Sequence, residues 1–320
     1  MNLKTSSGLL ITSISQKIPL IKSVKESVLK IAPQMKFYGA DIDDSNIGKY
    51  FVDEFWQMPR IDLLDINELV SFCQNNDVRY IIPTRDGELS YFSTYKEFLK
   101  GFDIHVMVSK LSSIEICLDK YNFYTFLQKL GLPVVQTTLT LDENNPSSSY
   151  VVKERYGSGS ASMGINLPYG KAMKHAKTLN EPIYQPMIEG TEFSIDMYID
   201  LNGRVKGVIC RDRVKVVNGE SQVTTVKNMP KLERLCSDVA EKLKLYGHVI
   251  FQVILDKEGN FHIIECNPRF GGASTLSVAA GLDSFYWFFL ESMGENLADY
   301  PFNRSEKELT LVRHPQDYIF

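Results

Sequence analysis

The chain contains 320 residues, of which 44% are hydrophobic and 23% are charged, and its formal net charge is −4. This length allows two or three packed units with a large core, and the composition is ordinary for a soluble globular protein. The weak negative charge gives no electrostatic reason to expect a nucleic acid or an anionic membrane as partner, so any phosphate binding must depend on a local site.

Cysteine and histidine usage excludes two further classes of protein. The five histidines form no closely spaced pair of the zinc type, and the odd number of cysteines with no C-x-x-C spacing argues against a disulfide framework. Free thiols in a reducing compartment are expected instead. No apolar run reaches membrane-spanning length and residues 1–7 lack a signal-peptide core, so we expect a cytoplasmic protein.

The first third of the sequence alternates between strand and helix patterns. Strands are predicted at Gly8–Ile14, Phe37–Ala40 and Arg79–Pro83, and helices at Pro19–Ile31 and Ile66–Cys73. Such alternation favours a parallel α/β sheet. No G-x-G-x-x-G follows the first strand, so a dinucleotide-binding fold has little support.

A polar loop follows the third predicted strand and contains Arg85, Asp86 and Glu88. Ligands of parallel sheets collect at the carboxyl ends of the strands, so these three residues are candidates for the ligand cleft. A merely solvated turn is the alternative.

The middle of the chain carries a lysine-rich and glycine-rich pattern. Residues 112–130 are predicted as one helix, with Ser112 and Glu115 as a capping box and Lys120 inside it. A strand, Tyr150–Lys153, is followed by the loop ERYGSGSASMG, whose backbone N–H groups and hydroxyls could close around oxyanions. The loop could equally be a linker, and no Walker motif is present, so a P-loop is excluded.

Several basic residues stand at the end of a predicted hairpin. The strand Ile183–Ile188 leads into the hairpin Phe193–Ile199 and Val205–Arg211. From the end of its second strand onward, basic residues occupy alternate positions, namely Arg211, Arg213 and Lys215. Alternate positions of a strand share a face, so these cations could stabilise a developing phosphate charge or could simply be solvated. Helices at residues 230–245 and 276–293 are expected only to pack.

The most informative stretch is FHIIECNPRFGGAS, residues 261–274. Glu265, Asn267 and Arg269 point to one side of this strand, and Gln252 on the partner strand faces them across a turn at residues 256–260. A carboxylate with amide oxygens suits Mg²⁺, which completes its shell with waters and substrate phosphates. The arginine supplies a planar fork for a carboxylate or phosphate. The alternative is an ordinary polar sheet edge.

The order Gln252, Glu265, Asn267, Pro268 and Arg269 resembles the metal-binding end of the ATP-grasp superfamily, closest to its carbamoyl-phosphate synthase-like and biotin carboxylase-like members. The resemblance implies a mixed α/β and α+β fold with a single grasp unit. Residues 1–111 would form a parallel α/β pre-ATP-grasp domain, residues 112–187 the lid subdomain, and residues 188–320 the C-terminal subdomain with the metal site.

The resemblance also implies ATP and Mg²⁺ as cofactors, with Mn²⁺ as a substitute, and it implies roles for individual residues. The metal ligands would be Gln252, Glu265 and Asn267. The nucleotide would contact Lys120, Lys153, Ser158, Gly159 and Ser160 at its phosphates, Gln185 and Met187 at adenine, and Glu192 at the ribose. Arg211, Arg213 and Arg269 would serve the reacting groups, and Arg85, Asp86 and Glu88 the substrate. Gln185 departs from the glutamate that is common at its position.

The implied activity is that of an ATP-dependent carboxylate-amine ligase acting on a small carboxylate and an amine. The carboxylate would attack the γ-phosphate of ATP, and the amine would then displace phosphate from the acyl phosphate, without any side-chain nucleophile. A partner-dependent ligase acting on a peptide or carrier is one alternative. A nucleotide-binding regulatory or scaffold protein is another, because Gln252 stands where a carboxylate would be expected. A homodimer is a reasonable expectation for this class of enzyme.

Overall fold

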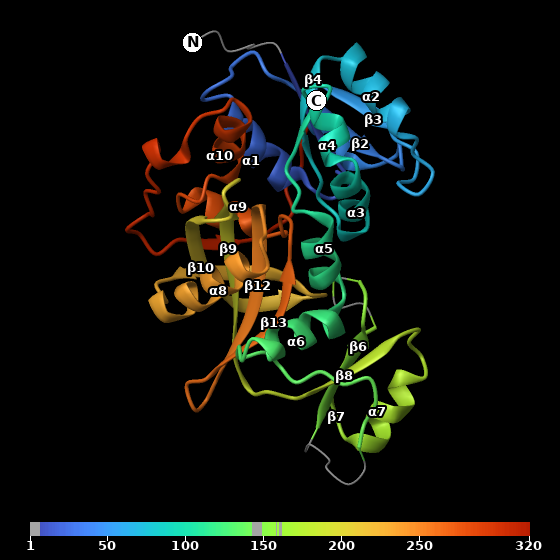
Figure 1. Ribbon diagram of the computed structural model, residues 1–320, viewed down its shortest axis with the longest axis vertical. Coiled ribbons are helices and arrows are strands. Elements are labelled where there is room, and N and C mark those ends of the chain that lie inside the picture. The colour runs from blue at the N-terminus through green and yellow to red at the C-terminus, as the bar shows by residue number, and fades with distance from the viewer. Residues whose placement is uncertain (1–6, 143–148, 158, 160–161) are drawn as a thin grey trace.

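The computed structural model describes residues 7–142, 149–157, 159 and 162–320. Three β-sheets follow one another along the long axis of the molecule: a parallel sheet at the top, a large antiparallel sheet in the middle and a small antiparallel sheet at the bottom (Figure 1). The predicted mixed α/β and α+β class is confirmed by these sheets.

The N-terminal sheet is parallel, with strand order β3-β2-β1-β4-β5. Its central strand β1 is buried along its whole length, as expected for a parallel strand covered on both faces. The two edge strands are short and lack a periodic signal, and the sequence did not predict them. The strands are β1 (Gly8–Thr12), β2 (Lys36–Asp41), β3 (Glu54–Gln57), β4 (Val78–Ile82) and β5 (His105–Val106). The helices are α1 (Ile18–Val28), η1 (Ile47–Phe51), α2 (Ile66–Asn75), α3 (Asp86–Thr94) and α4 (Lys96–Lys100).

The predicted single helix over residues 112–130 is wrong, because the chain forms two helices, α5 (Leu111–Leu118) and α6 (Lys120–Lys129). The break lies at Asp119, which is extended (φ −98°, ψ 101°) and accepts hydrogen bonds from the backbone N–H groups of Tyr121 and Asn122. Its carboxylate therefore caps a new helix instead of continuing the old one. The Ser112 capping box is also absent, since α5 begins one residue earlier without a side-chain cap.

The small sheet has the order β7-β6-β8 and is covered by one helix, α7 (Tyr169–Ala176). Its strands are β6 (Tyr150–Glu154), β7 (Gly164–Leu167) and β8 (Pro182–Pro186). A separate cluster of buried side chains holds this unit together, among them Val152 and Ala172. The unit therefore has a core of its own, distinct from that of the central sheet.

The central sheet has the order β13-β12-β9-β10-β11-β14 and is antiparallel throughout. Its strands are β9 (Gly190–Ile199), β10 (Val205–Val217), β11 (Glu220–Lys227), β12 (Gly247–Asp256), β13 (Phe261–Asn267) and β14 (Thr310–Val312). Helix α8 (Pro230–Lys242) buries one stripe against it, including Leu232 and Val239. The predicted helix over residues 276–293 is divided into α9 (Ser274–Ala279) and α10 (Ser284–Ser292), because Gly281 between them has φ +105°.

The end of the chain returns to the N-terminal unit after η2 (Leu297–Asp299) and β14. Strand β14 pairs with β11, with Val312 opposite Val223. Farther on, the rings of Tyr318 and Phe320 pack on Phe51, with centroids 4.9 Å and 5.5 Å away. Residues 310–320 thus contact both the central sheet and the N-terminal unit.

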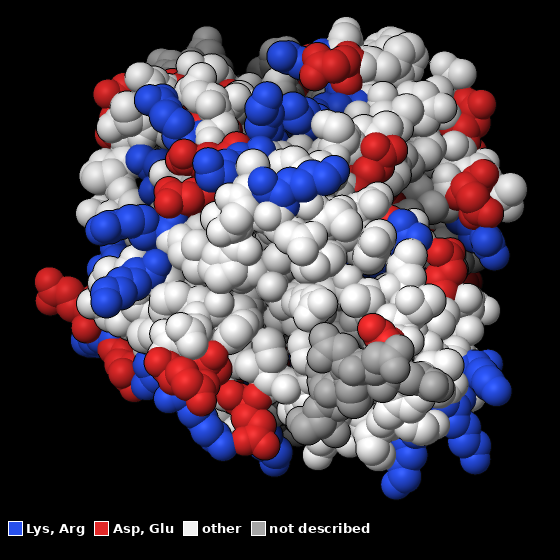
Figure 2. Space-filling view, turned by 60° about the horizontal axis from the view of Figure 1, so that its bottom comes forward, with Lys and Arg blue, Asp and Glu red and all other residues white. Residues whose placement is uncertain are grey.

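Among the residues described, none of the helices is both long and apolar enough to cross a bilayer. Figure 2 turns the end of the molecule that carries the β7-β6-β8 sheet toward the viewer, and on this face acidic and basic side chains are interspersed around a largely uncharged middle.

Candidate active site

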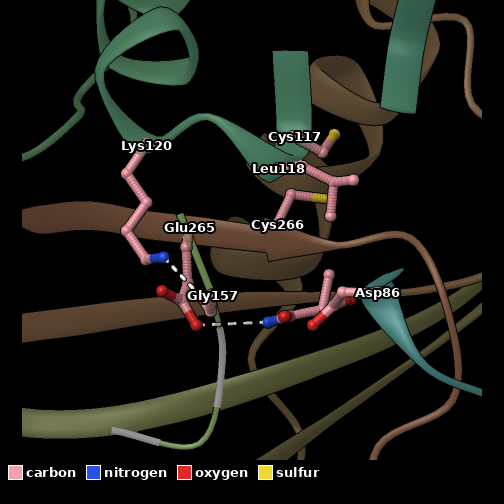
Figure 3. A pocket seen from close by; sticks show the side chains of 8 residues that line it. Asp86, Cys117, Leu118, Lys120, Gly157, Glu265 and Cys266 are labelled. Atoms are coloured by element: carbon pink, nitrogen blue, oxygen red, sulfur yellow. Dashed lines mark hydrogen bonds between the residues drawn. The ribbon is translucent and has the colours of Figure 1, made fainter. Parts of the chain in front are cut away.

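The hairpin β12–β13 brings the sequence-predicted metal residues together. Gln252 is paired in register with Glu265, as expected. Asn267 lies on the same face as Glu265, and its Nδ2 donates to Glu265 Oε1 over 3.2 Å. Both side chains line one small pocket, which Lys120 enters from the start of α6 (Figure 3). The other residues that line it are Asp86, Cys117, Leu118, Gly157 and Cys266.

Two lysines lie close to the pocket: Lys120 lines it, and Lys153 stands beside Glu265. Lys153 of β6 places its Nζ 3.8 Å from Glu265 Oε2, and Lys120 Nζ donates to the carbonyl of Gly157 over 2.7 Å. Burial alone would raise the pKa of Glu265, but Lys153 and Lys120 together hold it below its ordinary value. Burial also lowers the pKa of Lys153. Glu265 is therefore an ionised, partly exposed carboxylate, which is a suitable ligand for a hard cation.

The predicted nucleotide residues on β8, directly after it and on β9 have protein partners. Gln185 is buried and its Nε2 donates to Thr137 Oγ1 over 2.9 Å, while the backbone N–H of Met187 donates to Ser149 O over 2.9 Å. Glu192 accepts from Arg213 Nη1 over 2.7 Å. Of the phosphate-covering loop, Gly159 is exposed with φ +76°, whereas the predicted Ser158 and Ser160 lie outside the described residues.

Gln252 turns toward the Glu192–Arg213 pair. With its amide nitrogen directed at Glu192 and its oxygen at Arg213, it donates over 3.3 Å and accepts over 3.0 Å. Burial raises the pKa of Glu192, and Arg213 only partly opposes this effect. The amide thus bridges the two charged groups, so the three predicted metal ligands are neighbours but do not form one cluster of oxygen atoms.

Arg269 forms a two-pronged ion pair with Asp86, with Nε–Oδ1 and Nη2–Oδ2 distances of 2.7 Å. Its Nη1 donates to Phe270 O over 3.0 Å. This pair connects the loop after β4 to the end of β13, so Arg269, predicted to serve the reacting groups, and Asp86, predicted to bind substrate, hold each other.

The other two residues of the loop after β4 lie differently. Glu88 is buried, and its carboxylate accepts from the N–H groups of Thr84 and Arg85 and from Ser13 Oγ at 2.6–2.9 Å. The expectation that Glu88 faces the ligand cleft is therefore wrong, because its carboxylate oxygens are bonded to the protein's own loops. Arg85 is exposed at the start of α3.

Arg211 belongs to a buried polar network that the sequence analysis missed. Its Nε donates to Asp196 Oδ2 over 2.7 Å, and Asp196 Oδ1 accepts from Ser274 Oγ over 2.6 Å. His248 lies 3.2 Å from Asp196 and 2.8 Å from Ser284 Oγ. Burial would raise the pKa of Asp196, but Arg211 and His248 hold it well below its ordinary value. Arg211 is therefore enclosed, and its charge is matched by Asp196 within the central sheet.

The sequence signal for this network was a charged or polar residue next to apolar ones in two strands, Asp196 between Ile195 and Met197 on β9 and His248 before Val249 on β12. The predicted common face of Arg211 and Arg213 is confirmed, because their partners Asp196 and Glu192 stand four residues apart on β9. Lys215 follows a break in the strand register and is exposed.

No group of three or more His, Cys, Asp and Glu side chains within the described ranges is arranged to hold a metal ion. The protein therefore offers a cation one carboxylate, Glu265, and one amide, Asn267, at the end of β13. Such a set is typical of a cation whose remaining ligands come from a bound phosphate chain and water.

Two parts of the chain match known protein families. Residues 117–273 match the family described as ATP-grasp domain, and residues 9–107 match the family described as PylC-like, N-terminal domain. The chain belongs to the ATP-grasp superfamily.

Solved structures share the fold over nearly the whole chain. The biotin carboxylase domain of Hydrogenobacter thermophilus 2-oxoglutarate carboxylase, in complex with MgADP, ADP and bicarbonate, is 18% identical, with a TM-score of 0.70 over 93% of this chain and 72% of that chain. N5-carboxyaminoimidazole synthetase from Staphylococcus aureus with ADP is 16% identical, with a TM-score of 0.72 over 92% and 79% of the two chains. L-amino acid ligase from Bacillus licheniformis is 17% identical, with a TM-score of 0.67 over 91% and 75%. At these identities the likeness shows the fold alone.

Proposed function

We propose that this protein is an ATP-dependent ligase that activates a carboxylate as an acyl phosphate and joins it to an amine. The observation that carries the proposal is the pocket in which Glu265 and Asn267 face Lys153 and Lys120. Opposite charges at the meeting point of the lid and the central sheet suit a nucleotide bound as a magnesium complex. The similar L-amino acid ligase and N5-carboxyaminoimidazole synthetase support the same class of reaction.

The donor set fits Mg²⁺, and Mn²⁺ as a substitute. Glu265 supplies an ionised carboxylate and Asn267 an amide oxygen, both directed into the pocket. Gln252 would add a third oxygen if its amide turned away from Arg213. When bound, the cation would neutralise and orient the phosphate chain of ATP.

The nucleotide would be held by groups that the protein now pairs internally. Lys153 and Lys120 would contact its phosphates under the loop that contains Gly159, Ser158 and Ser160. Gln185 and Met187 would lie at adenine. Glu192 would lie at the ribose, with Arg213 beside it to offset phosphate charge. On this proposal residues 1–111, 112–187 and 188–320 act as the pre-ATP-grasp domain, the lid and the metal-binding subdomain.

The reaction would proceed in two displacements. A carboxylate oxygen of the substrate attacks the γ-phosphorus and ADP leaves, which gives an acyl phosphate. The amine then attacks the acyl carbon and inorganic phosphate leaves with that oxygen, while the amine loses its proton to water. Arg269, held in place by Asp86, would position the carboxylate or its phosphate. Arg85, which is exposed at the start of α3, would contact the substrate from the N-terminal unit. Arg211 would act only by supporting the sheet through Asp196.

The test is a screen for phosphate release from ATP and Mg²⁺ with pools of amino acids and small carboxylic acids, each with and without an added amine. The accepted acid is then labelled with ¹⁸O in its carboxylate. Transfer of one ¹⁸O atom into the released phosphate is expected, because that oxygen bridges the acyl and phosphoryl groups. Unlabelled phosphate would refute the acyl phosphate route and indicate simple hydrolysis.

A second candidate function is nucleotide sensing without turnover. It is favoured by Gln252, which offers an amide rather than a carboxylate, and by the closed pair of Arg269 and Asp86. ATP and Mg²⁺ binding by calorimetry without phosphate release from any pool would support this function over the ligase.

A further inference from the structure

The loop that carries Arg269 is bound to the central sheet through one buried residue, Ser274, the first residue of α9. Its Oγ accepts from the backbone N–H of Gly271 over 3.0 Å, and its own backbone N–H donates to Gly271 O over 3.2 Å. The same Oγ donates to Asp196 Oδ1 on β9 over 2.6 Å. One hydroxyl group therefore connects the loop between β13 and α9 to strand β9.

The hydrogen bonds of Ser274 Oγ are all made within the protein. A hydroxyl offers one donor and two acceptor positions. The donor goes to Asp196, and the acceptor positions face the Gly271 N–H and His248 Nε2, which lies 3.1 Å away. Burial lowers the pKa of His248, so its ring is neutral, and a proton donated by Ser284 Oγ to Nδ1 over 2.8 Å leaves the ring's own proton on Nε2. Ser274 is thus fully occupied by the protein and does not touch a ligand.

A stack of rings holds the same loop at Phe270, the residue after Arg269. The ring of Phe270 stacks on the imidazole of His248, with centroids 4.0 Å apart, and on the ring of Phe285, with centroids 4.5 Å apart. All three rings are buried. The carbonyl of Phe270 accepts from Arg269 Nη1 over 3.0 Å. The backbone next to Arg269 is therefore fixed by packing as well as by hydrogen bonds.

The two ends of the Arg269 side chain are held by different parts of the molecule. Its guanidinium is bound to Asp86 of the N-terminal unit through Nε and Nη2. Its backbone follows Asn267, whose Oδ1 lies 3.5 Å from Nη2, and leads into the loop held by Ser274. Where Arg269 stands relative to the metal-side pocket therefore depends on that loop. A shift of about 1 Å in a group that orients a substrate can cost about a hundredfold in rate.

We propose that Ser274 is a positioning residue for the reaction: by joining the Gly271 N–H to Asp196, it keeps Arg269 aligned with the metal-side pocket. This inference rests on the proposed ligase function, in which Arg269 orients the carboxylate or its phosphate. It gives the buried Asp196 network a role in activity in addition to its role in stability.

The first measurement is amide hydrogen exchange, which needs no substrate. In Ser274→Ala the Gly271 N–H loses its acceptor, so this amide should exchange about tenfold faster, the usual size of one hydrogen bond. Ser274→Thr keeps the hydroxyl and should restore protection to within about threefold. The matched control is Ser277→Ala on the same helix, because Ser277 is equally buried and its Oγ has no hydrogen-bond partner among the described residues. Melting curves establish that each variant is folded.

The second measurement is a double-mutant cycle in kcat/KM for the accepted acid. Ser274→Ala should lower this value about tenfold and leave KM for ATP unchanged. When combined with Arg269→Ala, it should cause no further loss, because a residue that acts through Arg269 then has nothing left to position. A residue that only stabilises the fold would instead multiply its effect with that of Arg269→Ala.

Equal exchange of the Gly271 amide in wild type and Ser274→Ala would overturn the proposal. Losses of kcat/KM that multiply in the double variant, or a loss of the same size in Ser277→Ala, would also overturn it. Absence of phosphate release with every acid refutes the ligase function instead, and the exchange measurement then decides whether Ser274 holds the loop.

Discussion

Replacing Glu265 by glutamine tests the electrostatic core of the candidate site. The substitution keeps the shape of the side chain and the contact with Asn267, but it removes the negative charge 3.8 Å from Lys153 Nζ. At an effective dielectric constant of about 20, that charge pair is worth on the order of 4 kcal/mol before desolvation is subtracted. The variant therefore loses a charged metal ligand and leaves Lys153 buried without its counter-ion.

We expect Glu265→Gln to reduce the Mg²⁺-dependent turnover of the accepted acid about a hundredfold or more, as loss of a charged metal ligand should. The pKa of Lys153 should fall further, since burial remains and the neighbouring carboxylate is gone. Phosphate release over a Mg²⁺ titration measures the first effect. Glu258→Gln, in the exposed turn of the same hairpin, is the matched control.

Retention of turnover within about threefold at every Mg²⁺ concentration would refute the assignment of Glu265 as the metal carboxylate. A loss that equals the control, or a loss explained by unfolding in a parallel melting curve, would also count against it. Only a loss in a folded variant that also shows weaker Mg²⁺ dependence agrees with the structure.

Three further predictions concern Lys96, Asp196 and Gln252. Burial lowers the pKa of Lys96 to about 8. Between about pH 8 and pH 10.5 the unfolded chain therefore holds more protons than the folded one, so the free energy of unfolding should rise with pH by up to roughly 3 kcal/mol. Urea titrations of wild type and Lys96→Met over this pH range should isolate the contribution of Lys96. Asp196→Asn leaves Arg211 buried without its partner and should cost about 3–5 kcal/mol of unfolding free energy, with exposed Asp238→Asn nearly neutral in the same titration. Gln252→Glu would place a carboxylate beside Glu192, so its melting temperature should fall without Mg²⁺ and recover more steeply than that of wild type as Mg²⁺ is added; an unchanged Mg²⁺ response would exclude Gln252 from the metal site.

The parts of the fold that local patterns control were predictable. The apolar alternation of β12 and β13 and the turn between them were sufficient to pair Gln252 with Glu265. The alternation of strands and helices likewise indicated the parallel sheet. In both cases the signal lies within a few tens of residues of sequence.

Contacts between distant segments were not predictable from the same patterns. Asp86 and Arg269 are 183 residues apart, so nothing local shows that they bind each other rather than a ligand. The break at Asp119 depends on its bonds to the guanidinium of Arg155 at 2.6–2.8 Å as well as on its capping of α6. A single helix is the natural prediction until that arginine is known to lie there.

The return of residues 310–320 to the start of the fold affects how the protein can be handled. Strand β14 covers the backbone edge of β11, and an uncovered strand edge can pair with the same edge of another molecule. Proteolytic loss of this segment would expose that edge and also remove the aromatic packing on Phe51. Aggregation during storage would then be an early sign that the end of the chain has been cleaved, before any loss of activity could be measured.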